Sequence, residues 1–281
     1  MEVILEIIKK LLEKNPLNVI SQIKVYMRYN INQLSKTYYQ KGWIVLKEYL
    51  KPSDVDNLKK KCLNYLKKNF KKYSGRHINF SGDLSNFSDI NSFHKASDIP
   101  IVRKMAKNKK FNKLIQNFLN QEKPKYMDSE IFAKPALNGL PSPLHQDNYY
   151  WAIKGGNAIT VWLALDDASK KNGGIFYYNQ SHKLGILKHK PSYAKGSSQT
   201  IKDLKKLKQL KKSFPNLKKG DILIHHSQVA HGSNANNSKV SRTGLTFQFK
   251  TQHSKTDKVQ MKLYLRELKM QVSSRPQANL G

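Results

Sequence analysis

Two histidines and one aspartate, from separate parts of the sequence, form a candidate metal-binding set. His145 and Asp147 occur as a His-x-Asp pair, and His231 follows much later, within residues 229–233. On a strand or at its end, residues i and i+2 point to the same face, so one imidazole and one carboxylate can reach one ion. Two histidines and a carboxylate make up the facial triad of non-haem iron(II) oxygenases, which leaves positions on the iron for a co-substrate and O2.

A single arginine strengthens this interpretation. Arg242 follows His231 and opens the segment 243–250, which we expect to be a strand. A guanidinium fork can grip a carboxylate through two parallel hydrogen bonds, as the distal carboxylate of 2-oxoglutarate would require. A His-x-Asp pair alone also occurs by chance. The order of all four residues along the chain, after expected strands, is what indicates the iron site.

Short apolar runs bounded by turn residues fill the chain after residue 125 and predict a β-rich core. Strands are expected over residues 131–133, 159–165, 174–178, 221–224 and 245–249. Runs of this length favour a β-sandwich or barrel. The stretches 135–143 and 188–213 are long interruptions, and long loops in a compact β domain are often lids or binding loops.

The part of the chain before residue 120 is predicted to be mainly helical. Residues 1–12 have the pattern of an amphipathic helix rather than of a secretory signal, because charges interrupt the apolar residues. Residues 42–46 predict a short strand. The next helix is expected to begin near Pro52, with Ser53 and Asp56 as a capping box.

A further helix is expected over residues 99–119. We interpret the chain as one domain, with a helical N-terminal layer (1–120), a β core (125–250) and a C-terminal extension (251–281). No internal repeat or linker divides it.

Cysteine usage and hydropathy indicate in which cellular compartment the protein is expected. Of 281 residues, Cys62 is the lone cysteine, which excludes an intrachain disulfide and favours a reducing, cytoplasmic compartment. No run of about 18 apolar residues occurs, so no membrane span is expected.

The net charge of +32 would suit a nucleic-acid binder or a membrane-surface protein. However, the excess is mostly lysine spread along the chain, which fits an A+T-rich coding composition better. The lysine-rich stretch 202–219 shows no arginine-aromatic alternation, so a nucleic-acid partner is not favoured. We expect this stretch to be a solvated helical insertion; the alternative is a lid that attracts an anionic substrate.

The chain resembles the phytanoyl-CoA dioxygenase family over about residues 34–250. The matching motifs are Gly42-Trp43-Ile44-Val45-Leu46, Pro143-Leu144-His145-Gln146-Asp147, Val161-Trp162-Leu163-Ala164-Leu165-Asp166-Asp167, Gly173-Gly174, Ser181-His182-Lys183, Lys219-Gly220-Asp221 and His231-Gly232-Ser233. One departure is Asn179-Gln180, where the family usually has Pro-Gly.

This resemblance implies a double-stranded β-helix (a jelly roll, cupin-like), mainly β with flanking helices, and iron(II) held by His145, Asp147 and His231. Asp147 favours hydroxylation, because halogenating relatives lack the carboxylate ligand. A jelly roll that binds another metal is less favoured, since such cupin-type sites generally use more histidines.

The resemblance also implies a 2-oxoglutarate site. Arg242 would pair with the distal carboxylate, Ser233 would hydrogen-bond to the same group, and Trp162 would line the pocket. Lys134, before the first metal motif, would lie near that pocket.

Several other residues have competing interpretations. His225 and His226 would point to opposite faces of a strand, so we expect one to pack in the barrel and the other to be at the surface, neither as a ligand. Tyr149 and Trp151 either line a substrate pocket or pack in the barrel. His182 is expected to be a loop residue that can approach the substrate.

The predicted function is that of an iron(II)- and 2-oxoglutarate-dependent dioxygenase. It would hydroxylate an unactivated C–H bond of a small metabolite, with a polar or anionic one weakly favoured, and release succinate and CO2. The alternative is a catalytically inactive jelly-roll protein whose basic surface binds an anionic partner. The substrate and the oligomeric state stay unassigned, although residues 259–270 can pack against another subunit.

Overall fold

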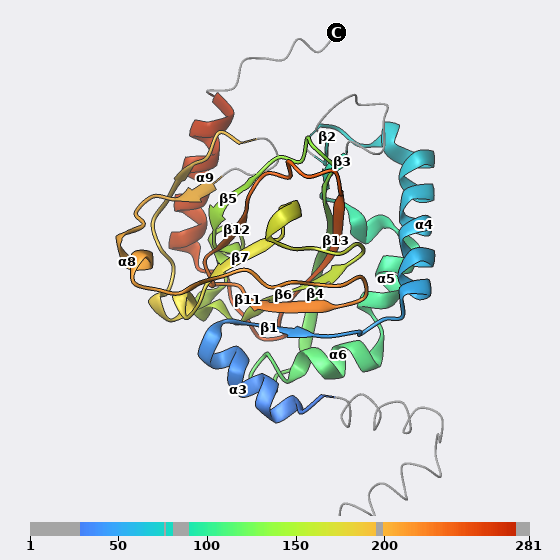
Figure 1. Ribbon diagram of the computed structural model, residues 1–281. Helices are drawn as coiled ribbons and strands as arrows, with labels where there is room; N and C mark the ends of the chain where they lie inside the picture. Colours follow the sequence, from blue (N-terminus) through green and yellow to red (C-terminus); the bar gives the residue numbers. More distant parts are fainter. Residues whose placement is uncertain (1–28, 76, 81–89, 195–198, 274–281) are drawn as a thin grey trace, which may run out of the picture.

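The centre of the molecule is a pair of antiparallel sheets that face each other (Figure 1). The structure is a computed structural model that describes residues 29–75, 77–80, 90–194 and 199–273. The helix expected over residues 1–12 lies outside these ranges. The two facing sheets form a double-stranded β-helix, which confirms the expected fold class.

The larger sheet contains the long strands of the core. Within the described ranges its strand order is β1-β11-β6-β13-β4-β3-β2. These strands are β1 (Trp43–Leu46), β2 (Ile78–Phe80), β3 (Ile90–Phe93), β4 (Pro124–Lys134), β6 (Ala158–Ala164), β11 (Ile222–His226) and β13 (Arg242–Thr251). The five strands expected after residue 125 all form, although 131–133 is only the end of the much longer β4.

The smaller sheet has the order β10-β7-β12-β5. Its strands are β5 (Ser142–His145), β7 (Ile175–Tyr178), β10 (Lys212–Ser213) and β12 (His231–Ser233). A separate ribbon pairs β8 (His189–Pro191) with β9 (Gln199–Ile201).

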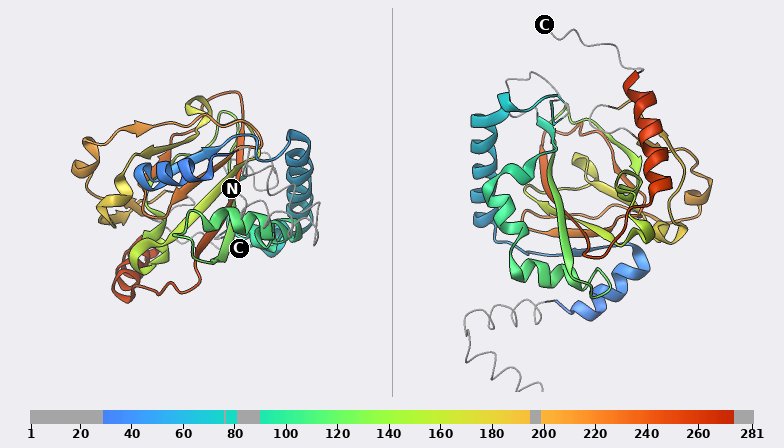
Figure 2. Two further views of the ribbon diagram at one scale, coloured as in Figure 1. Left: turned by 90° about the horizontal axis from the view of Figure 1, so that it is seen from below. Right: turned by 180° about the vertical axis from the view of Figure 1, so that it is seen from behind.

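Side chains along the strands of the larger sheet point alternately to its two faces, so the residues of the cavity and those of the hydrophobic core lie on opposite faces. On β13, Leu245 and Phe247 pack into the main hydrophobic cluster on the outer face, while Arg242 and Thr246 face the smaller sheet and a cavity between the sheets. Helices cover the outer face (Figures 1 and 2). They are α3 (Ile31–Lys41), α4 (Pro52–Asn69), α5 (Pro100–Ala106) and α6 (Lys109–Gln116).

Two helix predictions need correction. The capping box at Ser53 and Asp56 was wrong: Pro52 is the first helical residue, Lys51 is the N-cap, and no side chain caps the helix. Proline suits that position because its fixed φ is helical and its missing N–H would have no partner in the helix.

The single helix expected over 99–119 is two helices, α5 and α6. The chain leaves the helical conformation at Asn108, whose side chain accepts hydrogen bonds from the backbone N–H groups of Lys110 and Phe111. Asparagine competes with helix continuation in this way, so it ends one helix and begins the next.

The lysine-rich stretch 202–219 is not the helical insertion that we expected. Its only helix within the described residues is the four-residue α8 (Lys205–Lys208), and β10 then pairs with β7. The ammonium of Lys212 lies 3.7 Å from the centre of the Phe176 ring. Packing on the smaller sheet therefore decides the conformation here.

The C-terminal helix α9 (Lys258–Ser273) folds back on its own chain. It packs beside α7 (Asp147–Trp151) and β8, on the side of the barrel opposite to α4 (Figure 2). Its exposed face still carries apolar side chains, among them Val259, Leu265 and Val272. In the described part of the chain, no helix is long and apolar enough to cross a membrane.

Candidate metal centre and co-substrate pocket

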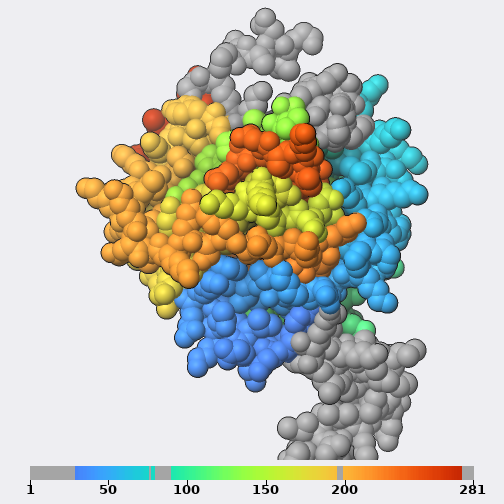
Figure 3. All heavy atoms as spheres, viewed as in Figure 1, coloured from blue at the N-terminus to red at the C-terminus, as the bar shows by residue number. Residues whose placement is uncertain are grey.

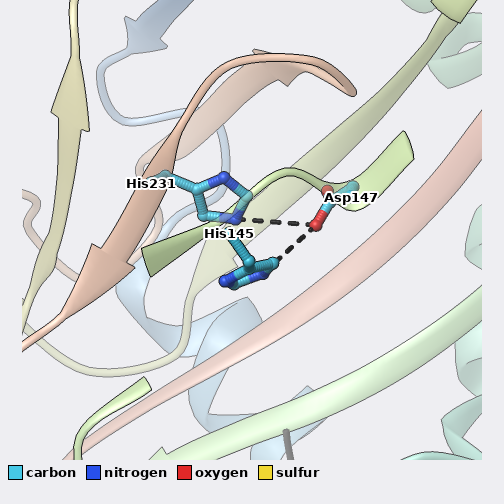
Figure 4. Close-up of side chains that lie close together, drawn as sticks. All are labelled: His145, Asp147 and His231. Atoms are coloured by element: carbon cyan, nitrogen blue, oxygen red, sulfur yellow. Dashed lines mark ion pairs between the residues drawn. The ribbon is translucent and has the colours of Figure 1, made fainter. Parts of the chain in front are cut away.

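His145, Asp147 and His231 point toward one common position (Figure 4). His145 ends β5 and pairs across the smaller sheet with His231 on β12. Asp147 is the first residue of α7, so the chain turns from strand to helix between the two ligands of the His-x-Asp pair, and strand alternation is not what aligns them. Oδ1 of Asp147 lies 3.5 Å from Nε2 of His145 and 3.6 Å from Nε2 of His231.

The hydrogen bonds of the two imidazoles leave their Nε2 lone pairs free. Nδ1 of His145 is 2.7 Å from the carbonyl oxygen of Pro143, and Nδ1 of His231 is 3.0 Å from that of Val229. A carbonyl only accepts, so each Nδ1 carries the proton. Three lone-pair donors thus converge within 4.8 Å of one another, an arrangement that a bound cation would satisfy.

The second oxygen of Asp147 is held by the protein. Its Oδ2 accepts hydrogen bonds from Thr160 Oγ1 at 2.6 Å and from His225 Nε2 at 3.0 Å, which leaves Oδ1 for an ion. Burial raises the pKa of Asp147, but the nearby His231, His145 and His225 hold it well below its usual value. Burial and His145 together lower the pKa of His231. An ionised carboxylate and a neutral imidazole are the forms that bind metals.

His225 is a functional candidate that sequence reasoning missed. Since the Asp147 carboxylate only accepts, Nε2 of His225 carries the proton, and its Nδ1 accepts from the Tyr177 hydroxyl at 2.9 Å. The expectation that one of the two histidines packs in the barrel is confirmed by buried His225. The surface location of the other was wrong: His226 is half-buried, with Tyr38 and His182 beside its ring.

The metal residues line a cavity of about 550 Å³ between the two sheets. Arg242, Trp162 and Ser233 line the same cavity. Figure 3 shows the molecule from the side on which the loop after β6 and the segment before β13 lie against each other. That contact is tight, because a Cβ on Gly173 would lie 2.9 Å from the carbonyl oxygen of Asn234.

Arg242 is a buried cation without a carboxylate partner among the described residues. Its Nε and Nη2 donate to the carbonyl oxygen of Gly173 at 3.1 and 2.9 Å, and its Nη1 donates to that of Phe132 at 3.2 Å. Burial lowers the pKa of Arg242 to about 10, so it stays charged at neutral pH. A buried charge is stable only when it is paired, so this cavity is suited to an anion.

Trp162 is on β6, the strand that pairs with β13, and its ring lies beside Arg242. The centre of its ring is 5.5 Å from the guanidinium carbon of Arg242. A Cβ on Gly244 would come within 1.9 Å of the indole, so glycine at this position is what lets the ring lie against the strand.

Lys134 lies near the pocket, opposite Arg242 across β4 and β13, but it does not reach the cavity surface. Its Nζ donates to the backbone carbonyls of Leu140 and Asn234, and Lys134 is not among the residues that line the cavity. Burial, with Arg242 nearby, lowers its pKa to about 6. Lys134 therefore supports the loops behind the pocket.

Of the three residues weakly assigned to substrate, one faces the cavity. Trp151 lines it, while Tyr149 is buried and stacks on His189 with ring centres 3.9 Å apart. Successive residues of α7 point about 100° apart, so Tyr149 turns away and Tyr150 takes its place. His182 is also away from the cavity: its Nε2 donates to the carbonyl oxygen of Tyr39 at 3.0 Å.

The fold and the site together define a jelly-roll protein with a two-histidine, one-carboxylate metal site. The family model for phytanoyl-CoA dioxygenase (PhyH) matches residues 38–244. The chain belongs to the phytanoyl-CoA dioxygenase family.

Two relatives and two solved structures of one further protein illustrate the similarity. Phytanoyl-CoA dioxygenase domain-containing protein 1 of Danio rerio is 31% identical over 121 residues, which are 42% of this chain and 41% of the relative. Phytanoyl-CoA dioxygenase 1 of Oryza sativa subsp. japonica is 30% identical over 153 residues, 52% of each chain. The matches thus span about half the length of these relatives or less.

EctD from S. alaskensis, in a crystal structure with bound Fe, superposes with a TM-score of 0.66 at 19% identity, over 80% of this chain and 78% of EctD. A second structure of EctD contains 2-oxoglutarate and 5-hydroxyectoine; it has a TM-score of 0.64 at 18% identity, over 80% of this chain and 77% of EctD. At these identities the superposition shows a shared fold.

Proposed function

We propose that this protein is an iron(II)- and 2-oxoglutarate-dependent dioxygenase that hydroxylates a small metabolite. One observation carries the proposal: an intact His145, Asp147 and His231 set opens into the same cavity as the unpaired cation of Arg242. Family membership and the Fe and 2-oxoglutarate bound by EctD support it.

In this proposal each residue of the cavity has a defined task. His145, Asp147 and His231 would hold the iron, and their outer hydrogen bonds orient the three side chains before it binds. Arg242 and Ser233 bind the distal carboxylate of 2-oxoglutarate, and Trp162 forms a wall of its site. With these groups in place, the bound iron supplies the redox chemistry that couples conversion of 2-oxoglutarate and O2 into succinate and CO2 to hydroxylation of a C–H bond.

The test is anaerobic titration of the purified protein with iron(II) and 2-oxoglutarate, followed by the weak visible absorption band of the chelate. We expect the band in the parent protein and its loss in Arg242→Ala, because the variant lacks the cation for the distal carboxylate. The exposed Arg103→Ala is a matched control that should keep the band.

Folding of each variant is checked by circular dichroism, and Arg242→Lys is a second variant that keeps the charge. It should restore part of the affinity for 2-oxoglutarate, since an ammonium offers no bidentate fork. A folded parent protein that gives no band would contradict the proposal.

A further inference from the structure

The cavity is poor in basic side chains although the chain is rich in them. Lys+Arg number 51 against 19 for Asp+Glu, yet Arg242 is the only Lys or Arg among the described residues that line the cavity. In the proposed function, the distal carboxylate of 2-oxoglutarate is bound to Arg242. An anionic substrate would therefore find no remaining Lys or Arg in the described wall.

An acidic residue faces the same cavity. Glu130 lies on β4, and its Oε1 is 2.5 Å from Nδ1 of His94, while its Oε2 accepts from Nε2 of Gln248 at 2.7 Å. A carboxylate has about four lone-pair sites, so about two stay available. Its side chain is 21% exposed although it lies inside the barrel, which leaves room for a ligand to approach.

Further hydrogen bonds hold this acidic wall in place. Nε2 of His94 lies 3.0 Å from Oγ of Ser92, which also accepts from Nδ2 of Asn79 at 3.0 Å. Asn79, His94, Glu130 and Gln248 all line the cavity. Residues on or next to four strands (β2, β3, β4 and β13) therefore hold the Glu130 carboxylate in place before any ligand arrives. This reduces the entropy that is lost when a ligand binds.

The acidic wall lies far from the arginine but beside the metal centre. Glu130 pairs across the sheet with Thr246 of β13, which is four residues from Arg242, or about 14 Å along the strand. Gln248 pairs across the sheet with Thr160, which holds Asp147. A small anion on Arg242 cannot also reach Glu130, so the acidic wall is free for a second molecule.

Other walls of the same cavity are aromatic and apolar. Tyr150 and Trp151 of α7, and Tyr264 and Leu268 of α9, line the cavity. They suit a ligand with an apolar body.

We propose that Glu130, held by His94 and Gln248, binds a hydrogen-bond donor of the substrate, an ammonium or a hydroxyl group on an apolar body, and disfavours anionic substrates. This inference rests on the proposed function for the occupancy of Arg242. It narrows the weak preference for small polar or anionic metabolites, which the sequence suggested, to polar ones that carry a hydrogen-bond donor.

The experiment compares three probes with one apolar body: phenylbutylamine, phenylbutanol and phenylbutyrate. Their binding to the protein loaded anaerobically with iron(II) and 2-oxoglutarate is measured by calorimetry, which does not depend on turnover. We expect the amine to bind most tightly and the carboxylate least. Glu130→Gln should weaken amine binding by about tenfold, the loss of one charge-assisted hydrogen bond.

Two variants control for loss of structure. Asp128→Asn removes a carboxylate from the same strand at a residue that does not line the cavity, and it should leave all three affinities unchanged. Glu130→Asp keeps the charge and should retain the preference for the amine over the carboxylate. If amine and alcohol bind equally and both depend on Glu130, the charge of the ammonium adds no affinity and the site accepts either donor.

Tightest binding of phenylbutyrate, no binding by any probe, or an affinity for amine and alcohol that Glu130→Gln leaves unchanged would overturn the inference. The absorption band of the chelate is recorded on the same samples. Its appearance without a dependence on Glu130 rejects the acidic wall alone. A dependence on Glu130 in protein that forms no band rejects the proposed function alone.

Discussion

At the scale of single residues, His225 fixes the orientation of the carboxylate that the metal would bind. It is buried and donates to Oδ2 of Asp147, while Tyr177 donates to its other nitrogen. Tyr177 in turn stacks between Trp43 and His231. The chain from tyrosine to carboxylate leaves Asp147 Oδ1 facing the two histidine ligands.

We expect His225→Phe to weaken iron(II) binding by about 10- to 100-fold, the usual effect of removing a hydrogen-bond partner of a metal ligand. The reason is that Asp147 would keep Thr160 as its sole donor at Oδ2 and could rotate. Anaerobic iron(II) titration in the presence of 2-oxoglutarate measures the affinity. His226→Phe, on the same strand but without contact to Asp147, should bind iron as the parent does. Equal affinities for the two variants would mean that His225 has no positioning role.

At the scale of elements, the turn after β7 shows the physical cost of a departure from the family pattern. Gln180 has φ of 67°, in the left-handed region, and its N–H donates to the carbonyl oxygen of Lys41. The family usually has glycine at this place, which adopts positive φ without a steric penalty. Before η6 (Ser181–Leu184), the chain thus adopts a left-handed turn at a residue less suited to it than glycine.

Gln180→Gly should therefore raise the free energy of unfolding by about 0.5–1 kcal/mol, the relief of left-handed strain less the extra entropy of glycine. Urea denaturation measures the change. Gln209→Gly is the matched control, because Gln209 is also exposed but has φ of −82°, and this substitution should be neutral or destabilising. The idea fails if both variants change stability in the same direction and by the same amount.

At the scale of the whole molecule, the helical layer and the jelly roll share one hydrophobic cluster. Residues of α3, α4, α5 and α6 pack with those on the outer face of the larger sheet, including Val161, Phe247 and Phe249. This sharing supports the single-domain organisation, which stays a prediction. The positive charge of the chain is not concentrated in the cavity, where Arg242 is the one Lys or Arg among the described lining residues.

Because of that shared core, we expect unfolding in one transition. The Trp residues Trp43, Trp151 and Trp162 all lie in the jelly-roll part, so their fluorescence reports the β core, whereas far-ultraviolet circular dichroism reports the helices as well. The two urea curves should coincide. Separate midpoints would show that the helical layer and the β core unfold as independent units.

The sequence by itself determined the type of fold and the residues of the candidate centre. Strand-length apolar runs predicted the strands of the core, because each side chain on a pleated sheet must suit its own face. His145, Asp147, His231 and Arg242 could be identified since their chemical types and order are unusual together, whatever their surroundings.

Only the tertiary structure decided which other side chains reach the cavity. Contacts such as His225 with Asp147, or Glu130 with Gln248, join residues far apart in sequence through strand register, which no local pattern encodes. The sequence also could not show that Lys134 and Tyr149 do not line the cavity. Backbone carbonyls hold Lys134 away from it, and the turn of α7 directs Tyr149 away from it. A residue's type limits the chemistry it can do, while the packing of distant segments decides where that chemistry is available.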